Sequence, residues 1–153
     1  MLLVRRIFFL NAFVEDSSAM LEPAHQISAF HQAPAPQRRA LVADDDPSIR
    51  TFLHDFLEHC GFEVRTAPDG ATALALFHAE QFDVVLVDFQ MPGMTGLEIA
   101  TEIRRANANI PIGLITGVAN TLDPQTVSRS GITRIFHKPF NLEELAAWLG
   151  ALP

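Results

Sequence analysis

The segment FDVVLVDF at residues 82–89 places the strongest constraint on the fold of this chain. Its centre is an unbroken apolar run rich in Val and Leu, without alternating polar residues. Such a run is typical of a strand buried on both faces, as in a parallel sheet covered by helices on either side. The segment IPIGLIT at 110–116 has the same character. These two segments predict an α/β fold.

From Arg38 onward, short apolar runs alternate with helical periods. Three further strands are predicted, at 39–43, 62–67 and 132–137. Helices are predicted at about 47–60, 70–80, 96–106 and 122–130, and again after Asn141. Five strand–helix units in succession imply a doubly wound, five-stranded parallel sheet with helices on both faces.

The first of these helices has the clearest pattern. Asp46 is placed to cap it, with Pro47 at its first position. Apolar residues recur at helical spacing and form one stripe, at Ile49, Phe52, Leu53, Phe56, Leu57 and Cys60. We therefore expect Cys60 to be buried at the end of this stripe. Because Cys60 is the only cysteine, an internal disulfide is excluded, which suits a reducing compartment and a cytoplasmic protein.

The first 37 residues differ in composition from the rest. Their apolar stretch is too short to span a bilayer, and the segment after it is rich in Pro, Ala and Gln. We expect residues 1–37 to be a flexible arm or sequence upstream of the true start codon, and residues 38–153 to form the domain. The net charge is −7 without a basic run, so we expect neither a nucleic-acid partner nor a membrane partner.

Polar residues follow the predicted strands at the points where they end. The set consists of Asp44, Asp45 and Asp46 after the first strand, Asp88 after the third, Thr116 after the fourth and Lys138 after the fifth. Lys138 is the only lysine in the chain. Because ligands in such folds bind where the parallel strands end, these side chains are expected to converge on one edge of the sheet.

Carboxylates that converge in this way repel one another unless a cation lies among them. Their hard oxygen atoms suit Mg²⁺, which takes one or two carboxylates together with waters and a phosphoryl oxygen. A carboxylate flanked by Mg²⁺ and an ammonium can act as a nucleophile towards phosphorus and form an aspartyl phosphate. The metal and Lys138 would neutralise charge on the phosphoryl oxygens, and Thr116 could donate a further hydrogen bond.

Four motifs at the strand ends, LVADDDPSIR, VVLVDFQMPGMTGLEI, GLITG and FHKPF, together resemble the receiver domain of two-component response regulators. The resemblance runs from about residue 38 to residue 152, with the motifs in order. It implies a flavodoxin-like (βα)5 fold with strand order 2-1-3-4-5. It also implies a cis peptide bond between Lys138 and Pro139, which an X–Pro sequence permits at low cost.

The resemblance implies a role for each residue of the strand-end set. Asp88 would be the phosphoacceptor, and Lys138 would pair with the phosphoryl oxygens. Thr116 would be the hydroxyl that moves towards the phosphoryl group. The Mg²⁺ ligands would be Asp45 directly, Asp44 through water, Asp88 and the backbone carbonyl of Gln90.

This set implies a phosphorylation-dependent signalling switch and not an enzyme that acts on other substrates. The donor would be a phosphohistidine on a sensor histidine kinase or on a histidine phosphotransfer protein. Since no output domain follows residue 152, we expect a single-domain response regulator. It would act by binding an unknown downstream protein or by passing phosphate along a relay.

One position departs from the family pattern. The family usually carries Tyr or Phe three residues before the lysine, whereas this chain carries Ile135. Phe136 follows one place later, where strand alternation turns its side chain to the opposite face. The usual aromatic switch is therefore in question, and we expect output to rely more on the loop and helix after Thr116.

A phosphatase is the alternative interpretation. DDDPS at 44–48 is close to the D-x-D-x-S nucleophile motif of haloacid-dehalogenase-type phosphatases, which also use Mg²⁺ and an aspartyl phosphate. In this hypothesis Asp44 is the nucleophile and Asp46 is the general acid. It leaves Asp88 unexplained. A phosphatase of this kind would keep turning over after Asp88→Asn but not after Asp44→Asn.

Overall fold

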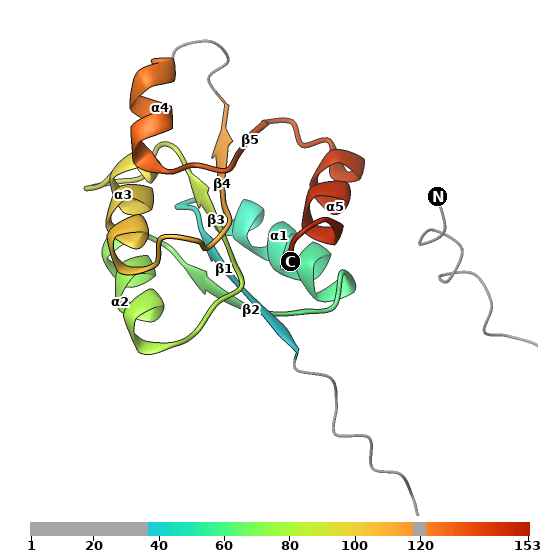
Figure 1. Ribbon diagram of the computed structural model, residues 1–153. Helices are drawn as coiled ribbons and strands as arrows, with labels where there is room; N and C mark the ends of the chain where they lie inside the picture. Colours follow the sequence, from blue (N-terminus) through green and yellow to red (C-terminus); the bar gives the residue numbers. More distant parts are fainter. Residues whose placement is uncertain (1–36, 118–121) are drawn as a thin grey trace, which may run out of the picture. The chain divides into compact units, whose positions relative to one another are not determined.

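The computed structural model describes residues 37–117 and 122–153, in which strands and helices alternate regularly (Figure 1). The strands are β1 (Arg38–Ala43), β2 (Phe62–Ala67), β3 (Val84–Asp88), β4 (Ile112–Thr116) and β5 (Arg134–His137). The helices are α1 (Pro47–His59), α2 (Gly70–Ala79), α3 (Gly96–Ala106), α4 (Pro124–Ser130) and α5 (Leu142–Gly150). The predicted arm at 1–37 falls, apart from residue 37, outside the described residues.

The strands form one sheet in the order β2-β1-β3-β4-β5, and every neighbouring pair is parallel. The predicted flavodoxin-like fold and its strand order are therefore confirmed. Because all strands run the same way, their carboxyl ends meet at one edge of the sheet. None of the helices in the described part of the chain is long and apolar enough to cross a membrane.

Each strand contributes to two apolar cores, one on each face of the sheet. On β1, Leu41 packs in a core with α2 and α3, whereas Val42 packs in a second core with α1 and α5. Figure 1 shows α1 and α5 on one side of the sheet and α2 and α3 on the other. All five residues of β3 are buried, which explains why residues 82–89 lack polar alternation.

The helix starts follow the predicted cap residues. Asp46 accepts a hydrogen bond from the backbone N–H of Ser48, and Pro47 begins α1. Asn141 caps α5 in the same way, through the N–H groups of Glu143 and Glu144. These caps place the residues between each strand and its helix in short turns at the edge where the site lies.

The predicted apolar stripe of α1 is wrong at two positions. Phe52 is 41% exposed and stacks on Phe140, with ring centroids 5.9 Å apart. Cys60 is exposed, because it lies one residue beyond the end of α1. The chain then turns at Gly61, whose φ of 89° is in the left-handed region. The helical period therefore stops before it carries Cys60 into the core.

Candidate functional site

The strand register brings the predicted residues to the same edge. Val87 is paired with Ala43, so Asp88 and Asp44 follow at the same level of β3 and β1. On the other side, Lys138 donates its backbone N–H to the carbonyl of Thr116 at 2.8 Å. Residues of the predicted set therefore lie together at this edge, at the ends of β1, β3, β4 and β5.

Lys138 is the centre of the site. Its Nζ lies 2.6 Å from Asp88 Oδ1 and 3.0 Å from Asp44 Oδ2. One ammonium thus bridges two carboxylates that come from different strands. The bond between Lys138 and Pro139 is cis, as expected.

Asp44 is the most deeply buried carboxylate of the site, with 0% of its surface exposed. Its Oδ1 accepts a hydrogen bond from the N–H of Asp46 at 2.9 Å. Burial raises the pKa of Asp44, and the nearby Asp88 carboxylate adds to this rise. The hydrogen bonds from Asp46 and Lys138 oppose it without cancelling it. The ionised form of Asp44 is therefore held at a cost, which an additional cation would relieve.

Asp88 is 5% exposed and has both carboxylate oxygens engaged. Oδ1 contacts Lys138, and Oδ2 accepts the N–H of Gln90 at 2.7 Å. The turn after Asp88 is tight, because a Cβ added to Gly96 would lie 2.4 Å from the Asp88 carbonyl oxygen. Only glycine fits the start of α3 at this distance from the strand.

The charge of Lys138 is secured by its two partners. Partial burial acts to lower the pKa of its ammonium, but the hydrogen bonds to Asp88 and Asp44 outweigh this effect and the pKa is raised. Lys138 therefore remains a cation between the two carboxylates throughout the neutral range. It is a mobile point charge that can change acceptors when a new anion enters.

The other predicted residues lie around this centre. Thr116 is buried at the end of β4, whereas Asp45 and Gln90 are exposed. The Asp45 carboxylate makes no hydrogen bond or ion pair with any residue of 37–117 or 122–153. The Asp46 side chain caps α1, and the N–H of Ser48 lowers its pKa.

The donor set fits Mg²⁺ by charge and chemistry. The carboxylates of Asp44, Asp45 and Asp88 outnumber the single ammonium of Lys138, so a divalent cation would balance them. All the available donors are oxygens, which Mg²⁺ prefers, and it takes few protein ligands because it keeps several waters. The residues present therefore fit the predicted metal, which Asp44, Asp45, Asp88 and the Gln90 carbonyl would hold.

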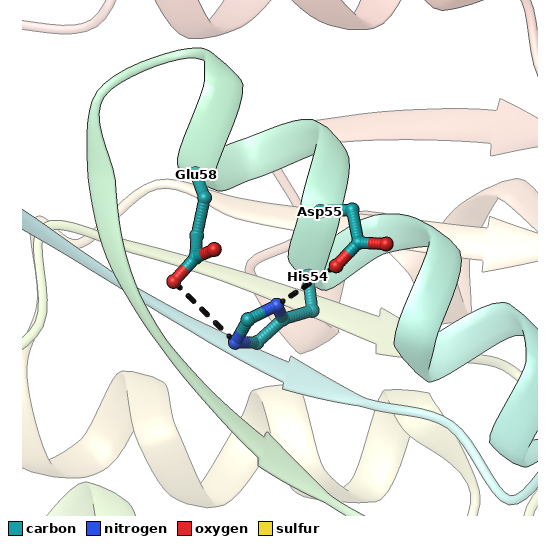
Figure 2. Close-up of side chains that lie close together, drawn as sticks. All are labelled: His54, Asp55 and Glu58. Atoms are coloured by element: carbon teal, nitrogen blue, oxygen red, sulfur yellow. Dashed lines mark hydrogen bonds and ion pairs between the residues drawn. The ribbon is translucent and has the colours of Figure 1, made fainter.

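A second group of potential ligands lies on α1, away from the strand ends. Within the described residues, three His, Cys, Asp or Glu ligand atoms come within 4.8 Å of one another only at His54, Asp55 and Glu58. Figure 2 shows the two ring nitrogens of His54 facing different carboxylates, with Nδ1 3.3 Å from Asp55 and Nε2 3.6 Å from Glu58. The ring of half-buried His54 therefore lies between two exposed carboxylates, an arrangement that is common on helix surfaces without a bound ion.

Sequence reasoning missed one residue at the site. Arg50, on the first turns of α1, donates from Nη1 to the backbone carbonyls of Asp44 at 2.7 Å and Asp45 at 2.9 Å. Every residue carries a main-chain carbonyl, so the types of the bound residues do not reveal a contact of this kind. The only available signal was an arginine one helical turn after the Asp46 cap.

The structure also separates the two residues considered for an aromatic switch. Ile135 packs against the core shared with α2 and α3. Phe136 is buried in the opposite core, where its ring lies 5.3 Å from that of Trp148 in an edge-on contact. The predicted alternation is confirmed, and the face of β5 that Ile135 occupies carries no aromatic side chain at that position.

The chain matches known proteins over the part that forms this site. A family model described as "Response regulator receiver domain" matches residues 40–149. A curated relative named "Probable transcriptional regulator ycf27", from Galdieria sulphuraria, is 40% identical over 111 residues, which cover 72% of this chain and 43% of that protein. The chain spans about half the length, or less, of the curated relatives it matches.

Two solved structures show the same fold at similar identity. The chemotaxis protein CheY4 of Vibrio cholerae has a TM-score of 0.71 and 34% identity, covering 76% of this chain and 99% of that one. The response regulator protein TrrA of Thermotoga maritima, solved in complex with Mg(2+)-BeF, has a TM-score of 0.70 with the same identity and coverage.

Proposed function

Because the chain belongs to the receiver domain family of two-component response regulators, we propose that it is a phosphorylation-dependent switch that accepts a phosphoryl group on Asp88. The observation that carries this proposal is the Lys138 ammonium, which bridges Asp88 and Asp44 at the edge of the sheet. Asp88 is the site carboxylate that ends the central strand β3, and its Oδ2 lies at the entry to the β3–α3 turn.

In the proposed reaction an oxygen of Asp88 attacks the phosphorus of a phosphohistidine on a sensor kinase or phosphotransfer protein. The P–N bond breaks, and its electron pair leaves with the imidazole of the donor. Lys138 then shifts one of its hydrogen bonds from a carboxylate to a phosphoryl oxygen, and Thr116 donates another. Mg²⁺ held by Asp44, Asp45, Asp88 and the Gln90 carbonyl would neutralise charge on the phosphoryl oxygens.

The proposed output is a change in protein binding or the passage of phosphate along a relay. Thr116 moves towards the new phosphoryl group and carries the start of the following segment with it. Because Ile135 occupies the usual aromatic position, the signal is expected to pass through that segment and α4. The net charge of −7 of the whole chain favours protein partners over a non-specific nucleic-acid partner, and we place the protein in the cytoplasm. The relative named as a probable transcriptional regulator makes DNA binding the competing output.

We do not propose turnover of external substrates. The phosphatase alternative needs Asp44 as an attacking group and Asp46 as an acid, but Asp44 has no exposed surface, and the N–H of Ser48, which Asp46 caps, lowers the pKa of Asp46 and disfavours its acid form. These contacts support chemistry that is confined to adding the phosphoryl group to Asp88 and removing it.

Beryllofluoride, which mimics a phosphoryl group on a carboxylate, tests the proposal. We expect saturable binding of one beryllofluoride per chain, followed by NMR, only when Mg²⁺ is present, and loss of this binding in Asp88→Asn. Asp83→Asn is the matched control, because Asp83 precedes the same strand at its opposite end and is exposed. Binding that is independent of Mg²⁺, or that persists in Asp88→Asn, would overturn the proposal.

A further inference from the structure

The direction of the Asp45 side chain depends on its backbone conformation. Its carboxylate is exposed and makes no hydrogen bond or ion pair with a residue of the described ranges, so no polar side-chain partner holds it in place. If Asp45 is to bind a metal directly, its Cα–Cβ bond must already point towards the site. The direction of that bond depends on the two peptide planes on either side of Asp45.

Arg50 holds both of these planes. The carbonyl of Asp44 belongs to the peptide before Asp45, and the carbonyl of Asp45 belongs to the peptide after it. Nη1 of Arg50 donates to the first at 2.7 Å and to the second at 2.9 Å. Because both planes are tied to one nitrogen, φ and ψ of Asp45 are restrained together.

The backbone of Arg50 is itself fixed in helix α1. Its backbone N–H donates to the carbonyl of Asp46 at 3.0 Å in the first hydrogen bond of α1. A helical side chain leans towards the N-terminus of its helix, which brings the guanidinium back over the residues before the cap. The peptide after Asp45 is also held from its N–H side, since Asp46 N donates to Asp44 Oδ1.

We infer that Arg50 is a positioning residue for the metal-binding pair Asp44 and Asp45, an inference that rests on the proposed function. Its hydrogen bonds go to the backbone of these two residues and not to their carboxylates. The charge of Arg50 and its restraint on the backbone have opposite effects on the affinity for Mg²⁺. A cation near the site repels the metal, so removing the charge alone would tighten Mg²⁺ binding. Losing the restraint on Asp45 would weaken it.

The test is Mg²⁺ affinity of the unphosphorylated protein, measured by calorimetric titration. We expect Arg50→Met to raise the Mg²⁺ dissociation constant about tenfold, in line with the effect of other residues that orient metal ligands. Arg50→Lys keeps the charge, but its nitrogen is one bond closer to the backbone than Nη1 and reaches the two carbonyls less well, so it should fall between Arg50→Met and the wild type. In Arg50→Met, phosphorylation by a small-molecule donor should reach half of its maximal rate only at a higher Mg²⁺ concentration than in the wild type. At saturating Mg²⁺ the rate should stay within about twofold of the wild-type rate.

Arg104→Met is the matched control. Arg104 also donates to main-chain carbonyls, those of Ala108 and Gly131, each at 2.6 Å, but it does so at the far end of α3. It should lose stability in urea unfolding without losing Mg²⁺ affinity. If Arg50→Met does not fold, Arg50→Lys carries the test and must weaken Mg²⁺ binding at least about threefold.

The outcomes separate this inference from the proposed function. Equal or tighter Mg²⁺ binding in Arg50→Met, beside a wild type that binds Mg²⁺, overturns the role of Arg50 alone. An equal loss of affinity in Arg104→Met overturns it as well, because the effect would then reflect general destabilisation. A wild-type chain without saturable Mg²⁺ binding overturns both the inference and the proposed function.

Discussion

The Nζ of Lys138 lies 2.6 Å from Asp88 Oδ1, so the only lysine of the chain is bound to the carboxylate at the end of the central strand. The same ammonium reaches Asp44 Oδ2 at 3.0 Å. A compact ammonium on a flexible stem can hold this bridge and still turn towards a new anion. A planar guanidinium would need more room and would favour one bidentate partner.

Removing this ammonium should destabilise the fold. In Mg²⁺-free buffer we expect Lys138→Met to lower the free energy of unfolding by about 2 kcal/mol, because two nearly buried carboxylates lose their cation. The loss is below that of a fully buried pair, since 28% of the Lys138 side chain is exposed. Urea unfolding followed by Trp148 fluorescence measures it. Added Mg²⁺ should restore part of the loss, and a variant as stable as the wild type without Mg²⁺ would contradict the bridging role.

Because the pKa of Asp44 is raised, its ionisation should lower the free energy of unfolding as the pH rises. Because the folded protein binds this proton more tightly than the unfolded chain, ionisation of Asp44 costs stability as the pH rises from about 4, where the unfolded carboxyl titrates, through the folded pKa. Without Mg²⁺, Asp44→Asn should therefore match the wild type at low pH and exceed it at neutral pH by about 1 kcal/mol.

Urea midpoints across the acid and neutral range check this prediction. Asp45→Asn is the neighbouring control, and its stabilising effect should be smaller because Asp45 is exposed. A neutral-pH stability of Asp44→Asn at or below that of the wild type would show that the ion pair with Lys138 outweighs the burial of Asp44.

The edge residues could be predicted from the sequence because a parallel sheet brings the ends of its strands together, whatever separates them in the chain. Asp44, Asp88 and Lys138 are predicted in this way, although the first and the last are 94 positions apart in the sequence. Arg50 could not be identified, since it holds main-chain carbonyls that every residue carries.

Burial along α1 was predicted less well, for a physical reason. A periodic pattern assumes that the helix continues and that its whole stripe is covered. Cys60 lies past the last helical residue, and Phe52 is covered only in part, by the ring of Phe140. Coverage depends on how far neighbouring elements reach, which local spacing does not encode.

Because the turn after Asp88 is tight, a single methyl group added at Gly96 should affect both stability and phosphorylation. A Cβ at Gly96 would lie 2.4 Å from the Asp88 carbonyl oxygen and 2.8 Å from Leu114 Cδ1, so Gly96→Ala must displace the end of β3 or the start of α3. We expect a loss of about 1–3 kcal/mol in unfolding free energy. The rate of phosphorylation should fall about tenfold or more, because Asp88 moves with the strand end.

Gly150→Ala is the control for this substitution. Gly150 is also helical, at the end of α5, and a Cβ there would meet nothing within 4 Å. It should leave the phosphorylation rate unchanged and should not lower the stability, because alanine favours a helix more than glycine does. If Gly96→Ala matched Gly150→Ala in both measurements, Asp88 would not depend on the close approach of α3.

The most direct test of the central claim is mass spectrometry of the protein after reaction with a small-molecule phosphoryl donor and Mg²⁺. We expect one phosphoryl group per chain, located on Asp88. It should be absent in Asp88→Asn, absent when Mg²⁺ is chelated, and retained in Asp83→Asn. A phosphoryl group on Asp44, or repeated turnover of a phosphate ester that survives Asp88→Asn and is lost in Asp44→Asn, would contradict the account.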